Sequence, residues 1–270
     1  MQPSRSRTLA AIAWWLAAAS ATATAAPVPS YSTLLTAAVD GSGFVMSTGF
    51  GQLPLDGAIG IATAESGTVP APYVSVAATS VSPSTTALAR GSAQLFYSFQ
   101  VVGPASNAPI PVLMTARGDI ALAGGHGLAY THFTVGSFGD LLFERRQCAG
   151  FQATGPDGKP CDTPVDFYAW QADQAQLFVD VAQNYLVGLD VLALAGDFSN
   201  AIATIDPVFE IDPRFAGADQ YQIVFSPGIV QAVPDDDDND NEVPEAPTLA
   251  LLAPAAWALA MSRRRRQLPR

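Results

Sequence analysis

Basic side chains are scarce in the long central part of the chain, residues 26–247. That part holds all 24 acidic residues against six basic ones, a formal charge of −18, and Lys159 is the only lysine of the chain. So acidic a surface repels the phosphates of nucleic acids, and it favours solubility outside the cell. We therefore expect no nucleic-acid partner.

Histidine is also rare, with only His126 and His132. Neither belongs to an HExxH zinc motif, and no nucleophile-elbow sequence or phosphate-binding glycine loop is present. We therefore expect no enzyme and no catalytic residue, with both histidines in loops or on a sheet surface. A hydrolase would need one of them beside a serine or cysteine nucleophile and an acid.

Only two cysteines occur, Cys148 and Cys161, and they enclose a turn-rich segment. In an oxidising compartment such a pair most often forms a disulfide, which would stabilise the fold by about 3 kcal/mol through closure of this loop. No ligand cluster surrounds the cysteines in sequence. We predict a structural disulfide and no metal at this pair.

Long apolar runs are missing, but each end of the chain carries a short one. Residues 1–25 are typical of a secretory signal peptide: Arg5 and Arg7 precede the apolar residues 9–19, and Ala23 and Ala25 supply the small side chains that a signal peptidase requires. We place the cleavage before residue 26. The alternative is an uncleaved anchor helix, for which the apolar stretch is shorter than a bilayer span.

The C-terminal end has three parts in order. An acidic spacer with a Pro-Glu element covers residues 233–247, and an apolar stretch of 15 residues, 248–262, follows it. As a helix that stretch covers about 22 Å, less than the roughly 30 Å of a bilayer core. The tail, residues 263–270, opens with four arginines that would stay cytoplasmic as a membrane stop: Arg263, Arg264, Arg265 and Arg266.

This arrangement resembles the PEP-CTERM sorting signal, on Val243, Pro244 and Glu245 with the apolar stretch and arginine cluster behind them. The chain departs from the usual motif because Ala246 stands where a third residue, proline, is expected. The resemblance implies an exosortase-type sorting enzyme as partner, a transient inner-membrane intermediate, and a final place at the cell surface or in an exopolysaccharide matrix. An ordinary C-terminal membrane anchor is the alternative.

The central part predicts strands. Residues 73–81, 93–102 and 110–116 alternate or are rich in β-branched side chains, with glycine and proline turns between such runs. We predict an all-β fold, an antiparallel, jelly-roll-like β-sandwich over residues 26–232, flanked by the two short terminal helices. Residues 167–183 could hold a short helix. Residues 93–116 and 205–229 also resemble the bodies of other PEP-CTERM proteins, which implies a β-rich fold and no catalytic residue.

The leading hypothesis is a non-enzymatic exported surface or matrix protein without a cofactor. The alternative is a carbohydrate-binding sandwich stabilised by calcium, because carboxylate oxygens suit that ion. The sequence offers two candidate calcium sites and one candidate aromatic platform for sugar. The candidates are Asp206, Asp212 and Asp219 for calcium, the acidic run 235–242 as a second calcium site or a mere spacer, and Tyr97, Trp170 and Tyr185 as a platform for sugar.

Overall fold

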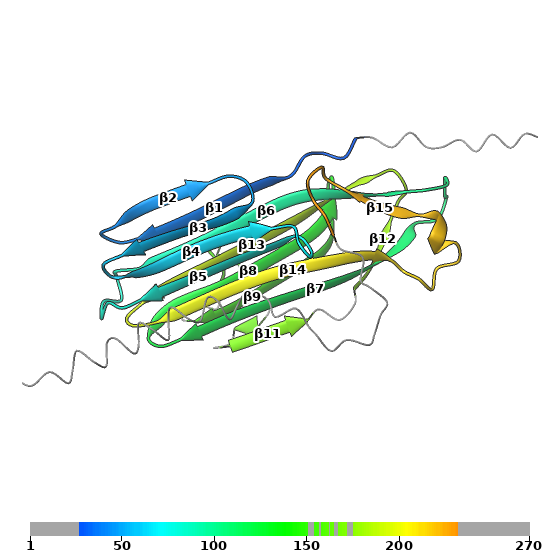
Figure 1. The fold of residues 1–270 in the computed structure, drawn as a ribbon. Coiled ribbons are helices and arrows are strands. Elements are labelled where there is room, and N and C mark those ends of the chain that lie inside the picture. The colour runs from blue at the N-terminus through cyan, green and yellow to red at the C-terminus, as the bar shows by residue number, and fades with distance from the viewer. Residues whose placement is uncertain are drawn as a thin grey trace, which may run out of the picture.

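The computed structural model describes residues 27–150, 154–156, 158–161, 163–164, 167–171 and 175–231. Two β-sheets pack face to face and form a β-sandwich, in agreement with the predicted all-β class (Figure 1). The signal peptide, the acidic spacer, the sorting helix and the basic tail all fall outside the described residues. Within the described ranges, no helix has the length and apolarity needed to cross a membrane.

The first sheet has eight strands in the order β10-β9-β8-β13-β6-β1-β2, with β15 also paired to β6. All pairs are antiparallel except that of β10 with β9. The strands are β1 (Ser32–Val39), β2 (Gly43–Ser47), β6 (Ala89–Val102), β8 (His126–Ser137), β9 (Asp140–Gly150), β10 (Thr163–Pro164), β13 (Asn184–Gly196) and β15 (Gln222–Phe225).

The second sheet has seven antiparallel strands in the order β11-β7-β14-β5-β4-β3, with β12 also paired to β7. Its strands are β3 (Gly51–Gly57), β4 (Gly60–Gly67), β5 (Tyr73–Ser80), β7 (Ile110–Ala123), β11 (Phe167–Gln171), β12 (Ala175–Val179) and β14 (Asn200–Ile211). The described part of residues 167–183 thus contains strands β11 and β12, and the helix considered for it is wrong there.

The core lies between the sheets and follows the two-residue period of the strands. On β6, the alternation predicted for residues 93–102 places Leu95, Tyr97, Phe99 and Val101 on one face, and each of them is at most 1% exposed. The partner strands contribute the inward residues of the same layer, and long-range pairing of β6 with β1 and β13 holds that layer in register. Every second residue of the first sheet therefore points outward, and these residues form the face described below.

Both ends of the described chain lie at one end of the sandwich, which we call the terminal end. There the carbonyl oxygen of Pro27 accepts a hydrogen bond from the amide of Asn184 at 3.4 Å, at the start of β13. Gln231 donates to the backbone oxygen of Phe209 at 2.6 Å, near the last residues of β14. In Figure 1 the blue start of the chain and the orange β15 lie together at this end.

Candidate functional site on the outer face of the eight-stranded sheet

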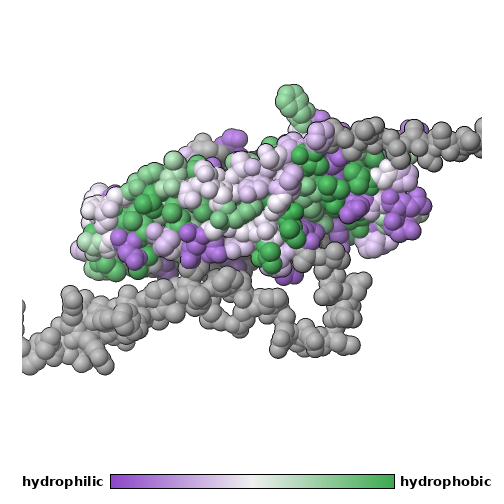
Figure 2. All heavy atoms as spheres, turned by 45° about the horizontal axis from the view of Figure 1, so that its top comes forward, coloured by the Kyte–Doolittle hydropathy of each residue, from purple (hydrophilic) through white to green (hydrophobic). Residues whose placement is uncertain are grey.

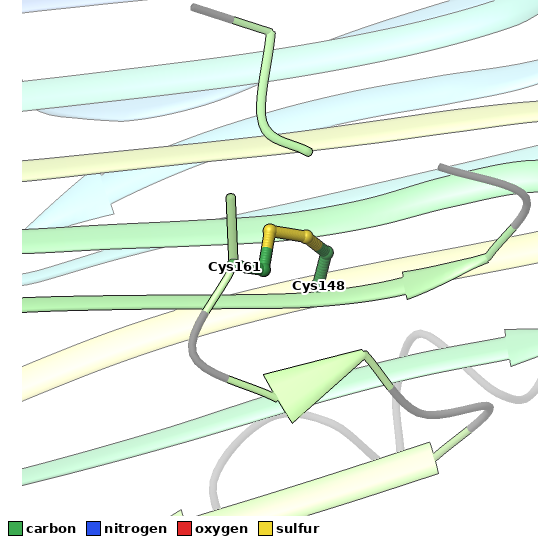
Figure 3. The surroundings of a disulfide bond; sticks show 2 residues. All are labelled: Cys148 and Cys161. Atoms are coloured by element: carbon green, nitrogen blue, oxygen red, sulfur yellow. A yellow bond between two sulfur atoms is a disulfide. The ribbon is translucent and has the colours of Figure 1, made fainter. Parts of the chain in front are cut away.

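A disulfide ties the segment that contains Cys161 to the outer face of the sheet. Cys148 on β9 and Cys161 are bonded with their Cα atoms 5.9 Å apart, so the predicted disulfide is present (Figure 3). Cys148 is fully buried, and it packs with Tyr130 and Leu192 in a small apolar cluster separate from the main core. The bridge therefore holds the segment of Cys161 over strands β8, β9 and β13.

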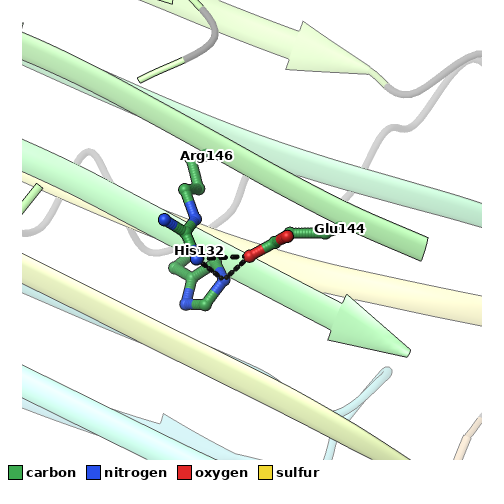
Figure 4. Close-up of polar contacts among 3 residues, drawn as sticks. All are labelled: His132, Glu144 and Arg146. Atoms are coloured by element: carbon green, nitrogen blue, oxygen red, sulfur yellow. Dashed lines mark hydrogen bonds and ion pairs between the residues drawn. The ribbon is translucent and has the colours of Figure 1, made fainter. Parts of the chain in front are cut away.

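A polar cluster lies next to the disulfide on the same face. His132 on β8 stands opposite Arg146 on β9, and Glu144 lies one outward position further along β9. The Nε2 atom of His132 is 2.9 Å from Oε1 of Glu144 and 3.3 Å from Nη2 of Arg146, which also donates to that carboxylate (Figure 4). The hydrogen bond from His132, followed by the contacts with Arg146, holds the pKa of Glu144 below its usual value.

The polar cluster continues across the sheet as one row. The strand registers align Gln94 on β6, Asp190 on β13, His132 on β8 and Arg146 on β9. The side chains of Gln94, Asp190 and His132 are half-buried and place amide, carboxylate and imidazole groups side by side, whereas Arg146 is only 6% exposed and holds Glu144 at the end of the row. The row is suited to bind a hydroxyl-rich ligand across the strands.

Beside the polar row, the face turns apolar toward the terminal end. The ring of Phe96 is 40% exposed on β6, directly opposite Gly188 on β13. One outward position further on, Leu186 and Leu141 stand on either side of Gly136, and they are 53% and 59% exposed. These two leucines line a shallow groove of about 290 Å³ with Gly136 as its floor.

The alternation of strand β6 in the sequence already indicates that Phe96 faces outward. Leu95 and Tyr97 of strand β6 share one parity, so the aromatic residue between them faces the other side of the sheet. An aromatic residue on the outward parity of a strand is either covered by another part of the chain or exposed. Phe96 is half exposed, and it is the aromatic side chain of this face that sequence reasoning missed.

The sugar platform expected from Tyr97, Trp170 and Tyr185 is wrong for the two tyrosines. Tyr97 and Tyr185 are 1% and 3% exposed and belong to the core, because both point inward on their strands. The ring of Tyr185 stacks on Phe99 with 5.5 Å between centroids, and its hydroxyl accepts a hydrogen bond from the backbone of Asp180 at 2.7 Å. The backbone of Trp170 lies in β11, where side chains are outside the described part.

The calcium site considered for Asp206, Asp212 and Asp219 does not assemble either. Asp212 accepts hydrogen bonds from Arg214 at 3.0 Å and from Gln176 at 2.7 Å, so its oxygens already have partners. Among the described residues, no three His, Cys, Asp or Glu side chains come together in a way that could hold a metal ion. The acidic run 235–242 lies outside those residues.

Within the described part of the chain, no serine side chain is a hydrogen-bond partner of His132 on the outer face. His132 contacts Glu144 and Arg146, and neither side chain is a nucleophile. At the start of β8, the hydroxyl of Ser199 donates to the carbonyl oxygen of His126 at 2.7 Å. That hydrogen bond is a turn contact of the backbone, and it does not activate the hydroxyl for attack.

Comparison with known proteins adds little to this geometry. No protein-family model matches the chain, and no curated protein sequence matches it. The enzymatically active domain of tailspike protein 4 of bacteriophage CBA120 is 13% identical, with a TM-score of 0.20 over 60% of this chain and 19% of that one. A structure of infectious bursal disease virus, Gx strain, is 10% identical, with a TM-score of 0.23 over 77% of this chain and 60% of that one. At such TM-scores neither likeness bears on function.

Proposed function

We propose that the chain is an exported surface or extracellular-matrix protein, sorted by an exosortase-type enzyme and without catalytic activity. The observation that carries the proposal is the Cys148–Cys161 disulfide in the body of the sandwich, because structural disulfides persist in oxidising compartments. The sequence adds a signal-like segment before this body and a PEP-CTERM-like segment after it. The disulfide and these two segments support the same route out of the cytoplasm.

The proposed route has three stages. The signal peptide, residues 1–25, starts export, and the apolar stretch 248–262 with its arginines then holds the protein briefly in the inner membrane. The sorting enzyme acts near Val243, Pro244 and Glu245 and releases the body toward an exopolysaccharide matrix. We also propose that the sandwich is jelly-roll-like, since neighbouring strands such as β1 and β6, or β5 and β14, come from distant parts of the sequence.

Intact mass spectrometry of the mature protein tests the route. Cells with and without the sorting enzyme are fractionated, and the mass of the protein is measured in each fraction. We expect a species that begins at residue 26 and ends between residues 244 and 247 when the enzyme is present. A mature species that still carries Arg263 and the residues behind it would support an ordinary anchor, and recovery of the uncut chain in the cytosol would refute export.

Replacement of the motif sharpens this test. Because Pro244 and Glu245 carry the resemblance, the double substitution Pro244→Ala and Glu245→Ala should leave the protein in the membrane fraction at its unprocessed C-terminal mass. Asp236→Ala and Asp237→Ala in the spacer form the matched control, and they should leave the processing unchanged. Equal processing of both variants would contradict recognition of this motif.

Polysaccharide binding by the outer face is a second candidate function. The half-exposed ring of Phe96 lies next to the polar row of Gln94, Asp190 and His132, and a sugar ring needs both an apolar surface and hydrogen-bonding groups. The hydroxyl of Thr134 lies on the same face, opposite Gly188. This arrangement replaces the buried tyrosines as the site for a carbohydrate ligand.

Glycan-array binding of the secreted protein tests this candidate. Phe96→Ala should lower binding to exopolysaccharide about tenfold, because it removes the apolar surface under the sugar. Phe44→Ala is the matched control, since Phe44 is 61% exposed on β2, the edge strand that is separated from β6 by β1. Equal loss in both variants would show nonspecific adhesion, and a chelator arm would report any need for calcium.

A further inference from the structure

A hairpin of strongly exposed apolar side chains projects from the sandwich. Strands β8 and β9 are joined by Phe138 and Gly139, between the paired residues Ser137 and Asp140. Phe138 is fully exposed, at 107% of its reference surface, and Leu141 and Leu142 are 59% and 38% exposed. Exposed apolar side chains that gather on one part of a soluble protein often mark a binding surface.

The hairpin tip is held firmly by the strands behind it. Next to the exposed residues, Phe143 packs on Phe133 of β8 with 5.3 Å between ring centroids. Gly139 has a φ of 96°, which glycine adopts without strain and which closes the turn in two residues. Leu142 has no partner in the strand register, because Val135 pairs with Phe143 and Gly136 pairs with Leu141. The exposed side chains therefore belong to an ordered turn.

The tip lies at the terminal end of the sandwich. Strand β8 reaches the turn beside Leu186, at the start of β13, close to Asn184 and its hydrogen bond with Pro27. The last described residue, Gln231, also lies at this end. Figure 2 shows two apolar patches on the visible face, with a paler and more polar region between them.

The C-terminal apolar stretch, residues 248–262, follows in the sequence from the terminal end of the sandwich. Sixteen residues, 232–247, separate Gln231 from the stretch 248–262. Fully extended, they span at most about 55 Å, so an apolar stretch held in a bilayer keeps the terminal end within that distance of the membrane. The formal charge of −18 on residues 26–247 disfavours electrostatic attraction of the sandwich to anionic lipids.

We propose that the β8–β9 tip is a membrane-interface contact, in which Phe138, Leu141 and Leu142 enter the headgroup region while the protein awaits processing. This inference rests on the proposed sorting route. The occupant is a bilayer surface, because the apolar stretch 248–262 follows from the same end of the sandwich. Aromatic and leucine side chains favour the boundary between headgroups and acyl chains.

Tryptophan emission of the full chain in phosphatidylcholine vesicles tests the contact, in a background in which the four native tryptophans, Trp14, Trp15, Trp170 and Trp257, are replaced by phenylalanine. Phe138→Trp should shift its emission to the blue on reconstitution and be quenched by brominated lipid. Phe44→Trp, at a 61% exposed position on β2, is the control and should show the same emission with and without vesicles. A Phe138→Trp emission that stays at the solvent value with vesicles present would overturn the proposal. A blue shift without vesicles, at raised protein concentration, would also overturn it, because it would indicate that the tip binds a second copy of the chain.

The processed protein supplies a second measurement. Phe138→Ser with Leu142→Ser should lower its partition into phosphatidylcholine vesicles about tenfold, and partition of the unaltered protein should survive high salt. Equal partition of both forms would count against the tip. The intact mass at the C-terminus reports sorting independently of these readings, so failure of the sorting route and failure of the membrane contact are distinguishable.

Discussion

Phe96 lies across Gly188, its direct partner on the neighbouring strand. A Cβ atom added at Gly188 would stand 3.1 Å from Cε1 of Phe96 and 2.7 Å from the hydroxyl oxygen of Thr134. The missing side chain of Gly188 thus leaves the space that the ring covers, and the ring shields a glycine that would otherwise weaken its strand. The exposed ring of the outer face therefore depends on a glycine of β13, the strand next to β8 of the polar cluster.

Gly188→Ala should therefore lower the free energy of unfolding by about 1–2 kcal/mol, because the ring or Thr134 must move. In a Phe96→Ala background the same substitution should cost less, by about 1 kcal/mol, since the ring no longer occupies the space. Urea unfolding of the four proteins of this cycle measures the difference. Additive effects of the two substitutions would show that the ring does not lie over the glycine in solution.

The strand pattern made most of the fold predictable, and the outer face was harder to predict. The parity of Leu95, Tyr97 and Phe99 identified a buried face of β6 because alternation reports burial directly. The same alternation says nothing about which strands become neighbours, so the row of His132 and Arg146 could not be seen before the registers were known. Local patterns identify a strand face, whereas functional clusters depend on pairing between distant strands.

The disulfide should be worth about 3 kcal/mol of unfolding free energy through loop closure. The double substitution Cys148→Ala and Cys161→Ala should lower the urea midpoint accordingly. Reduced wild-type protein is the control. If loss of the bridge causes the lower stability, and not loss of the packing of the sulfur atoms, the double variant and the reduced wild type should have the same urea midpoint. Denatured, unreduced wild-type protein should take up no iodoacetamide, and an uptake of two groups would contradict the bridge.

A buried hydroxyl on β8 should cost stability. Thr131 is 1% exposed, and its hydroxyl has no hydrogen-bond partner among the described residues; the amide of its register partner Gln147 is in the same situation. Thr131→Val keeps the shape and removes the polar atom, so it should raise the unfolding free energy by about 1 kcal/mol.

Thr79→Val is the matched control for Thr131→Val. The hydroxyl of Thr79 donates to the side-chain oxygen of Asn200 at 3.0 Å, so its removal should lower stability or leave it unchanged. Thermal unfolding of both variants separates the two cases. A Thr131→Val protein less stable than wild type would show that this hydroxyl has a hydrogen-bond partner in solution, such as a buried water.

The stability of the sandwich should fall between about pH 4 and pH 6 because of Asp206. Burial raises the pKa of this side chain to about 6; Arg117, opposite it on β7, offsets part of the rise, and Asp119 adds to it. Because the folded pKa lies above the unfolded value of 3.8, the native state binds more protons across this interval. Unfolding free energy therefore decreases as pH rises, and the full penalty is present above pH 6.

Asp206→Asn removes the charge and should abolish that decrease. We expect the variant to be about 1–3 kcal/mol more stable than wild type at pH 7.5 and nearly equal to it at pH 4, where the wild-type carboxyl is mostly protonated. Asp219→Asn, on the exposed turn before β15, is the control and should change stability by less than about 0.5 kcal/mol at either pH. Urea unfolding across pH 4–7.5 gives the slopes. An Asp206→Asn protein that loses stability at pH 7.5 would mean that electrostatic attraction to Arg117 outweighs the cost of burying the carboxylate, with the charged form favoured in the fold.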